Sequence, residues 1–210
     1  MGTPKDSEKT RAKIIEAAGQ LFAERGFNGV TVREIVQKAV THLSALNYHF
    51  RTKEALYREV LLEACRDASL SPEDQEQLLR LEPREALYVL IGESIKNYQK
   101  QVASNWQTII ITRECWKPSS VFKEVVEVYF KSQTDFIADI IGKIADKPAN
   151  DHQVRFAVIV MIGVLDTFGL YGHLIDAIAP GLTDQLNKRN LHVKQLFLLV
   201  TQVAKTSIEE

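Results

Sequence analysis

The sequence has few residues of the kinds that mark secreted, disulfide-bonded or membrane-spanning proteins. It contains two cysteines, Cys65 and Cys115, and neither belongs to a CxxC pair, so we expect buried thiols in a reducing cytoplasm. No leader with a basic n-region and an apolar h-region is present. The longest apolar run, Phe156 to Leu165, is too short to span a bilayer and is ended by Asp166. We therefore expect a cytoplasmic protein with no membrane partner.

Recognisable reaction chemistry is also missing. We find no Ser-His-Asp order, no glycine loop of the kind that cradles phosphate and no pair of catalytic carboxylates. His152, His173 and His192 are scattered along the chain without metal-ligand spacing. These absences predict a protein that is not an enzyme and that uses neither a metal ion nor a cofactor.

No run with β-alternation and hairpin turn signals occurs in the chain, so we predict an all-α fold. Apolar residues instead recur at helical spacing. In a first helix that begins near Ser7 they are Ile14, Ala17, Ala18, Leu21 and Phe22. Gly26 follows this helix at the place where a left-handed residue commonly ends one.

Later helices are predicted from the same periodicity and from proline positions. A helix from Lys53 to about Ala68 precedes a seam over residues 69–83, which contains Pro72 and Pro83. Further apolar helical stretches follow at about Arg84–Ala103, Asn105–Trp116, Ser120–Ala145, Asp151–His173 and Arg189–Lys205.

The charge is unevenly distributed along the chain. A formal net charge of −1 argues against a nucleic-acid binder if the chain is treated as uniform. Residues 1–66, however, carry 11 Lys and Arg against 8 Asp and Glu, and the remaining residues carry 15 against 19. The sign of this difference suits a DNA-facing head on an acidic body.

The segment from Thr31 to Lys53 reads as two short helices followed by the start of a third. Thr31 and Glu34 have the T-x-x-E spacing of a capping box, in which each side chain bonds the other residue's backbone amide. Ile35, Val36 and Ala39 then give the first short helix one apolar stripe, and Arg33 stays outside it.

The second short helix, about His42 to His49, has an apolar side and a polar side. Leu43, Leu46 and Phe50 are assigned to the core. The residues assigned to the outer face are Thr41, His42, Ser44, Ala45, Asn47, Tyr48 and His49. Small, polar and aromatic side chains of this kind suit a helix that enters a major groove. Lys53, capped by Thr52, then opens a helix whose amino end favours phosphate. The alternative is three helices packed only for stability.

Residues 10–61 resemble the N-terminal DNA-binding domain of the TetR family of bacterial transcriptional regulators. The stretches AAGQLFAERGF, TVREI, NYHF and KEALY occur in the family's order and spacing. The resemblance implies a three-helix helix-turn-helix domain over residues 1–52, with Thr31 and Lys53 on phosphates and His42, Ser44, Ala45, Asn47, Tyr48 and His49 on the recognition helix. Arg33 and Thr41 complete the expected DNA-binding set.

One departure from the family pattern concerns the turn between the two short helices. The family usually has glycine there, where a positive φ costs little, and this chain has Val40. A β-branched residue is costly in that conformation, which leaves open whether the turn keeps its usual geometry.

A second resemblance covers part of the body. The stretch ITRECWKPSSVFKEVVEVYF, Ile111 to Phe130, is similar to a helix-Pro-helix segment of TetR regulators with a CerR-type C-terminal domain, some of which control efflux transporters. It implies that residues 53–210 form a helical ligand-binding and dimerisation domain.

Two body helices are apolar on more than one side, over residues 153–171 and near the C-terminus. In a small domain such helices often meet a partner subunit. We predict a homodimer interface through Val158, Met161, Leu165, Leu196, Phe197 and Val200. The alternative is that both helices are core helices of one chain.

Aromatic side chains on the body helices make a small-molecule site a further expectation. The predicted ligand-binding residues are Tyr98, Trp106, Arg113, Trp116, Tyr129, Phe130, Phe168 and Tyr171. Arg113 is the best polar candidate, because a guanidinium pairs with carboxylates and stacks on rings. The alternative is that the aromatics are ordinary core residues and that Arg113 forms a salt bridge or faces solvent.

The leading functional hypothesis is therefore a homodimeric repressor that binds a palindromic double-stranded DNA operator and is released by a small-molecule effector. The alternative is an all-helical small-molecule-binding or interaction protein whose helix-turn-helix has lost specific DNA binding.

Overall fold

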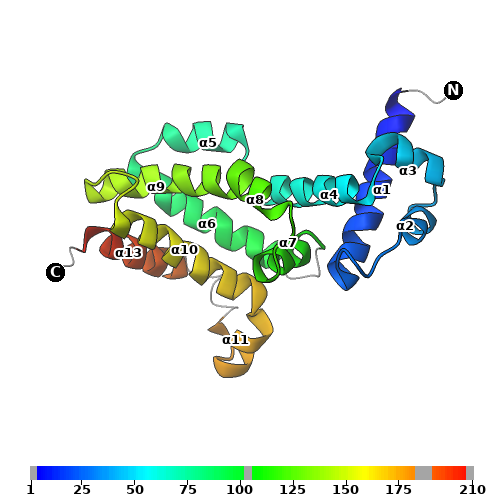
Figure 1. Cartoon of the computed structure of the whole chain (residues 1–210). Coiled ribbons are helices and arrows are strands. Elements are labelled where there is room, and N and C mark those ends of the chain that lie inside the picture. The colour runs from blue at the N-terminus through cyan, green and yellow to red at the C-terminus, as the bar shows by residue number, and fades with distance from the viewer. Residues whose placement is uncertain (1–3, 102–105, 183–190, 207–210) are drawn as a thin grey trace. The chain divides into compact units, whose positions relative to one another are not determined.

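The computed structural model describes residues 4–101, 106–182 and 191–206, and within these ranges the chain is helical without a β-strand (Figure 1). The predicted all-α fold is confirmed. The chain divides into two compact units, each with its own hydrophobic core. Unit 1 consists of Met1–Ser69 and Ser104–Phe130, and unit 2 consists of Leu70–Ala103 and Lys131–Glu210.

Unit 1 begins with the predicted helices of the head. Gly26 ends the first helix with φ +71°, and the Thr52 hydroxyl caps the fourth by accepting from the amide of Ala55 at 3.1 Å. The elements of unit 1 are α1 (Pro4–Arg25), α2 (Val32–Lys38), α3 (Leu43–Phe50), α4 (Lys53–Ala68), α7 (Trp106–Trp116), α8 (Phe122–Val125) and the π-helix η1 (Val126–Phe130).

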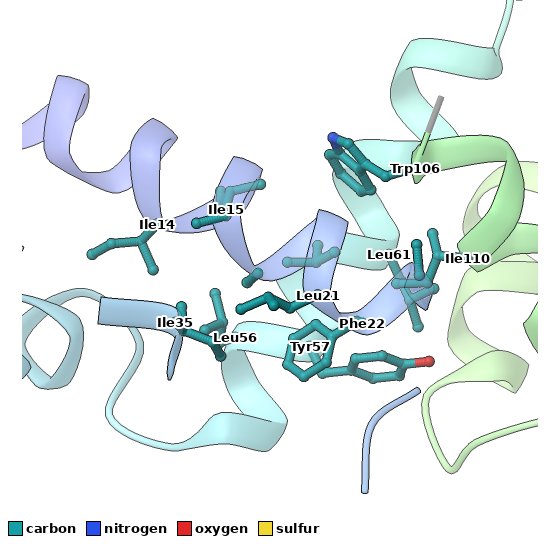
Figure 2. Packing of buried hydrophobic residues seen from close by; sticks show 14 of the residues in the cluster. Ile14, Ile15, Leu21, Phe22, Ile35, Leu56, Tyr57, Leu61, Trp106 and Ile110 are labelled. Atoms are coloured by element: carbon teal, nitrogen blue, oxygen red, sulfur yellow. The ribbon is translucent and has the colours of Figure 1, made fainter. Parts of the chain in front are cut away.

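The core of unit 1 joins the head helices to α7. Phe22 of α1 meets Tyr57 of α4 edge to face, with ring centroids 4.9 Å apart. Trp106 and Ile110 of α7 belong to the same buried cluster, and Figure 2 shows Ile110 beside Leu61 of α4. A segment about 40 residues beyond α4 in sequence therefore completes the core of the DNA-binding head.

The indole ring of Trp106 packs against Gly19 of α1, a position without a side chain. A Cβ added to Gly19 would be 2.5 Å from the indole ring, well inside van der Waals contact. The indole Nε1 donates to the Glu16 carboxylate at 2.9 Å, one turn earlier on α1. Glycine at this position lets the two helices approach closely enough for the ring to be buried.

Unit 2 is a helical bundle, and two of its helices, α5 and α10, start at a recognisable cap. Pro72 is the first residue of its helix after the Ser71 cap, and the Asp151 carboxylate accepts from the amides of Gln153 and Val154. The helices of unit 2 are α5 (Pro72–Leu79), α6 (Pro83–Gln101), α9 (Lys131–Ala145), α10 (His152–Leu170), α11 (Gly172–Ile178) and α13 (Leu191–Lys205).

Two predicted helices differ from the observed ones. The continuous helix expected over Ser120–Ala145 contains the π-helix η1 between α8 and α9. The helix expected to reach His173 ends at Leu170, and the short helix α11 follows Tyr171, which serves as the cap of both. The predicted functional boundary after residue 52 stays a prediction, since the compact units are defined by packing and divide the chain elsewhere.

The predicted dimer-interface residues need correction. Val158, Met161, Leu165, Leu196, Phe197 and Val200 are all buried in the core of unit 2. Both helices carry two apolar stripes, and periodicity alone does not say which stripe packs inside the chain. The exposed large apolar residues of these helices include Phe156, Ile159 and Leu170 on α10 and Leu198 and Leu199 on α13.

Helix α10 is also long and apolar enough, by length and composition alone, to cross a membrane. Core helices of soluble proteins often share this property, and this one packs Val154, Val158 and Met161 into the core of unit 2.

The two cysteines differ in environment. Cys65 is buried as expected, and burial raises the pKa of its thiol to about 12. Cys115, near the C-terminal end of α7, is exposed, contrary to expectation.

The close contact at Gly19 generates a stability prediction. Replacing Gly19 with alanine places a methyl carbon 2.5 Å from atoms of the indole ring. We therefore expect the free energy of unfolding to fall by about 1–3 kcal/mol. The control is Gly92→Ala in α6, where the nearest atoms to an added Cβ are 3.9 Å away, and we expect that change to raise stability by up to about 1 kcal/mol. Urea unfolding of both variants measures the difference, and equal effects would contradict the packing argument.

Candidate nucleic-acid interface

Helix α2 begins with the predicted capping box. The Thr31 hydroxyl accepts from the amide of Glu34 at 3.3 Å, and the Glu34 carboxylate accepts from the amide of Thr31 at 2.7 Å. Hydrogen bonds from Thr31 and from the Arg25 guanidinium lower the pKa of the Glu34 carboxyl to about 2. Glu34 is therefore ionised at neutral pH and holds the start of α2 in place.

The turn between α2 and α3 has the geometry that glycine usually provides. The amide of Val40 donates to the carbonyl of Gln37, and the amide of Thr41 donates to the carbonyl of Val36. These two bonds define a Schellman motif, with Val40 as its left-handed residue at φ +51°. The valine therefore adopts the costly conformation instead of changing the turn.

Helix α3 presents one side to the core and another to solvent. Leu46 and Phe50 are buried as predicted. His42, Ser44, Asn47 and Tyr48 are exposed, and Thr41, Ala45 and His49 are half-buried.

Leu43 is not in the core as expected. It is 47% exposed, because it starts the helix, where the first turn extends past the core that Leu46 and Phe50 reach. The outer face of α3 therefore includes an apolar residue that helical spacing alone assigns to the core.

The junction between α3 and α4 is tightly turned. Arg51 has φ +61° and ψ −52°, and the amide of Thr52 bonds the carbonyl of Phe50 across it at 2.6 Å, as in a γ-turn. Lys53 follows at the amino end of α4, with its ammonium 4.2 Å from the centre of the Phe27 ring. This cation–π contact fixes the stem of Lys53 beside the helix end, where the aligned amides favour an anion.

Two neighbouring residues of α7 form hydrogen bonds to the head helices α1 and α4. The Arg113 guanidinium donates to the carbonyls of Ala23 and Glu24 at 3.1 and 3.3 Å, which lie at the carboxyl end of α1. The buried carboxylate of Glu114 accepts from the Tyr57 hydroxyl of α4 at 2.6 Å. It also accepts from the amide and the hydroxyl of Ser119, so the buried charge has three hydrogen-bond partners. Burial and the Glu114 carboxylate together raise the pKa of Tyr57.

The predicted ligand-binding residues are divided between the two units. Trp106, Arg113, Trp116, Tyr129 and Phe130 lie in unit 1, and Tyr98, Phe168 and Tyr171 lie in unit 2. Arg113 is exposed and donates to carbonyls at the end of α1. Trp116 is 81% exposed, and the side chain of Tyr98 lies outside the described residues. A site built from all eight stays a prediction.

This fold, with a capped α2, a left-handed turn and an exposed polar face on α3, defines a helix-turn-helix DNA-binding protein. Two family models match the chain. Residues 14–60 match the model of bacterial regulatory proteins of the tetR family, and residues 83–205 match the C-terminal domain of the HTH-type transcriptional dual regulator CecR. The chain belongs to the TetR family and has a CecR-type C-terminal domain, so the subfamily label CerR is corrected to CecR.

Individual relatives are more distant. The chain is 26% identical over 124 residues to the "Probable HTH-type transcriptional regulator YttP" of Bacillus subtilis, a match that spans 59% of each protein. The solved structure of NalD, the secondary repressor of the MexAB-OprM multidrug efflux pump in Pseudomonas aeruginosa, covers 94% of this chain and 96% of its own at 20% identity, with a TM-score of 0.62. AibR in complex with isovaleryl coenzyme A and operator DNA covers 94% and 98% at 18% identity, with a TM-score of 0.61. The two structures share the fold.

The strained turn yields a second stability prediction. Val40 is 89% exposed, so Val40→Gly removes little packing and relieves the left-handed strain. We expect the free energy of unfolding to rise by about 1 kcal/mol, the strain relieved less the extra chain entropy of glycine. Gln37→Gly, at an exposed helical position of α2, is the control and should lower stability by about 1 kcal/mol. Chemical unfolding compares the two, and a loss of stability in both would mean that the valine is not strained.

Proposed function

We propose that this protein is a cytoplasmic homodimeric repressor whose two helix-turn-helix heads bind a palindromic operator and are released by a small-molecule effector. The observation that carries the proposal is the outer face of α3, where His42, Ser44, Asn47 and Tyr48 are exposed above a buried Leu46. Hydroxyl, amide and imidazole groups on such a face meet base edges in the major groove.

The flanking groups have the chemistry of phosphate contacts. Thr31 and Arg33 lie at the start of α2, and Lys53 lies at the start of α4. Contacts of this kind fix the register of the protein on the duplex, whereas side chains of α3 read its sequence. Thr41 and the half-buried Ala45 and His49 lie beside the outer face and allow close approach.

The proposed dimer uses the exposed sides of α10 and α13, which pack against each other within unit 2 (Figure 1). Phe156 and Ile159 on α10 and Leu198 and Leu199 on α13 are each about half exposed or more. Four large apolar side chains on adjacent helices favour a two-fold interface of two helices from each subunit. Such a dimer would hold two recognition helices about 34–36 Å apart for successive major grooves.

The proposed effector site lies in unit 2. Phe168 near the end of α10 lies 6.1 Å from His192 of α13, measured between ring centroids. The Nε2 atom of His192 is buried and has no hydrogen-bond partner among the described residues. An aromatic wall beside an unsatisfied polar atom suits a small molecule with one polar group. The AibR complex, which holds both a coenzyme A thioester and operator DNA, is consistent with separate sites for the effector and for DNA. Release would require a coupling of about 1–3 kcal/mol between the effector and DNA sites, with α4 as the moving helix.

The first experiment measures fluorescence anisotropy of the purified chain on its own upstream DNA and on a scrambled duplex over a salt series. We expect tight, sequence-selective binding that weakens steeply with salt, because phosphate contacts release counterions. Weak binding without selectivity or salt dependence would instead favour a helical binding protein whose head has lost DNA recognition, to which the strained Val40 and the low head charge point.

Substitutions in the head separate the two kinds of DNA contact. We expect Lys53→Ala to lower affinity for operator and random duplexes alike and to reduce the salt slope by about one per head. Tyr48→Ala should weaken operator binding, and Asn47→Ala should narrow the gap between operator and random DNA by about 1–3 kcal/mol. Sedimentation and circular dichroism check that each dimer stays folded. An equal loss on both duplexes would count against Asn47 as a base contact.

The corrected interface makes its own prediction. Ile159 is 61% exposed on α10, so Ile159→Lys leaves the protomer core intact and places two charges against each other in the proposed dimer. We expect the dimer dissociation constant to rise at least tenfold by analytical ultracentrifugation. Val89→Lys, at an exposed position of α6, is the matched control and should leave the dimer unchanged. A dimer that tolerates Ile159→Lys would move the interface elsewhere.

A further inference from the structure

We infer that Leu43 and Val40 make apolar contacts with 5-methyl groups of thymine in the operator, so that part of the sequence reading is hydrophobic. This inference rests on the proposed function, because it requires α3 to enter a major groove. It adds to that function a class of base and two residues that the polar pattern of the helix does not suggest.

Leu43 lies at the amino end of α3, the end of a recognition helix that commonly contacts bases. It is the first residue of the helix and is 47% exposed, and the amino-terminal residues of a recognition helix contact base edges in helix-turn-helix proteins. Asn47 lies four residues later on the same side and is also exposed. An aliphatic group and an amide therefore lie side by side on the outer face.

Val40 lies three residues before Leu43 and is 89% exposed. Its φ of +51° strains a β-branched residue, and glycine would avoid this strain. The side chain is almost fully exposed, so its burial in the described part of unit 1 does not offset this strain. A strained residue with no packing role is a reason to look for a role in binding.

Single exposed aliphatic side chains are ordinary on protein surfaces. Here, two of them lie within four residues at the entry to the recognition helix, beside the exposed polar residues His42 and Ser44. In the major groove, thymine is the base whose edge carries an apolar methyl group, and aliphatic side chains read it by contact. Both sides lose water-exposed apolar surface in such a contact, which is its source of free energy.

The test replaces thymine with deoxyuridine, which lacks only the 5-methyl group. The full-length chain first selects its tightest duplex from a random-sequence library. Each thymine of the half-site is then replaced in turn, at both symmetric positions, and affinity is measured by fluorescence anisotropy. We expect wild-type affinity to fall by about fourfold per contacted methyl group, the change that corresponds to exposing one buried methyl.

The variants assign the contacted methyl groups to residues. We expect Leu43→Ala to bind the thymine duplex more weakly and to lose discrimination between thymine and uracil at one position. Val40→Gly should lose discrimination at that position or at an adjacent one, although its fold is the more stable. Leu43→Gln, which keeps the length of the side chain, should also lose the methyl discrimination. Leu43 is outside the buried core, so these variants should fold, and thermal unfolding verifies that they do.

Two controls isolate the effect. Ile109→Ala removes an aliphatic group that is 43% exposed on α7 of the same unit and should keep the wild-type discrimination. Asn47→Ala should change preferences at other positions and leave the methyl effect in place. The inference is overturned if wild type binds thymine and uracil duplexes equally at every position, or if the Leu43 and Val40 variants keep the wild-type discrimination. Selection that yields no preferred sequence would overturn the proposed function together with the inference.

Discussion

The indole ring of Trp106 lies on Gly19, and this contact sets how α7 meets the DNA-binding head. Seven residues further along both segments, the Arg113 guanidinium lies over Gly26, the residue that follows α1, where an added Cβ would be 2.9 Å from its Nη1 atom. Helix α7 therefore meets α1 and the turn after it at two points, separated by seven residues in each segment. At each point a large side chain of α7 meets a glycine.

Polar contacts complete this arrangement on the α4 side. Glu114 follows Arg113 directly and accepts from the Tyr57 hydroxyl, so consecutive residues of α7 hold α1 and α4. Arg58 of α4 also pairs with Glu124 of α8, and Arg11 of α1 pairs with Glu59 of α4 at 2.5 Å. These outer pairs are partly exposed and contribute little individually. The buried Glu114 matters more, because removing one of its partners would leave an uncompensated charge in the core.

Much of the head could be predicted because its signals are local. The capping box of Thr31 and Glu34 and the helix end at Gly26 depend on residues within one turn of each other, and both are present. The body was harder, because α10 is apolar on two sides and only the folded chain decides that Met161 packs inward and Ile159 outward. Leu43 fitted the spacing of a core position, yet the start of its helix extends past the core. The role of Arg113 depends on carbonyls about 90 residues earlier in the sequence, which no local pattern reveals.

The discontinuity of unit 1 bears on how such regulators diversify and how they are engineered. Its core is assembled from Met1–Ser69 and from Ser104–Phe130, with part of unit 2 inserted between them in sequence. A fragment cut after residue 69 would therefore leave Gly19 and its buried neighbours uncovered. Recombination that exchanges only the first 69 residues between two regulators would pair a head with a foreign α7. Successful chimaeras, natural or designed, must either carry residues 106–130 with the head or keep a bulky ring and a glycine at matching positions.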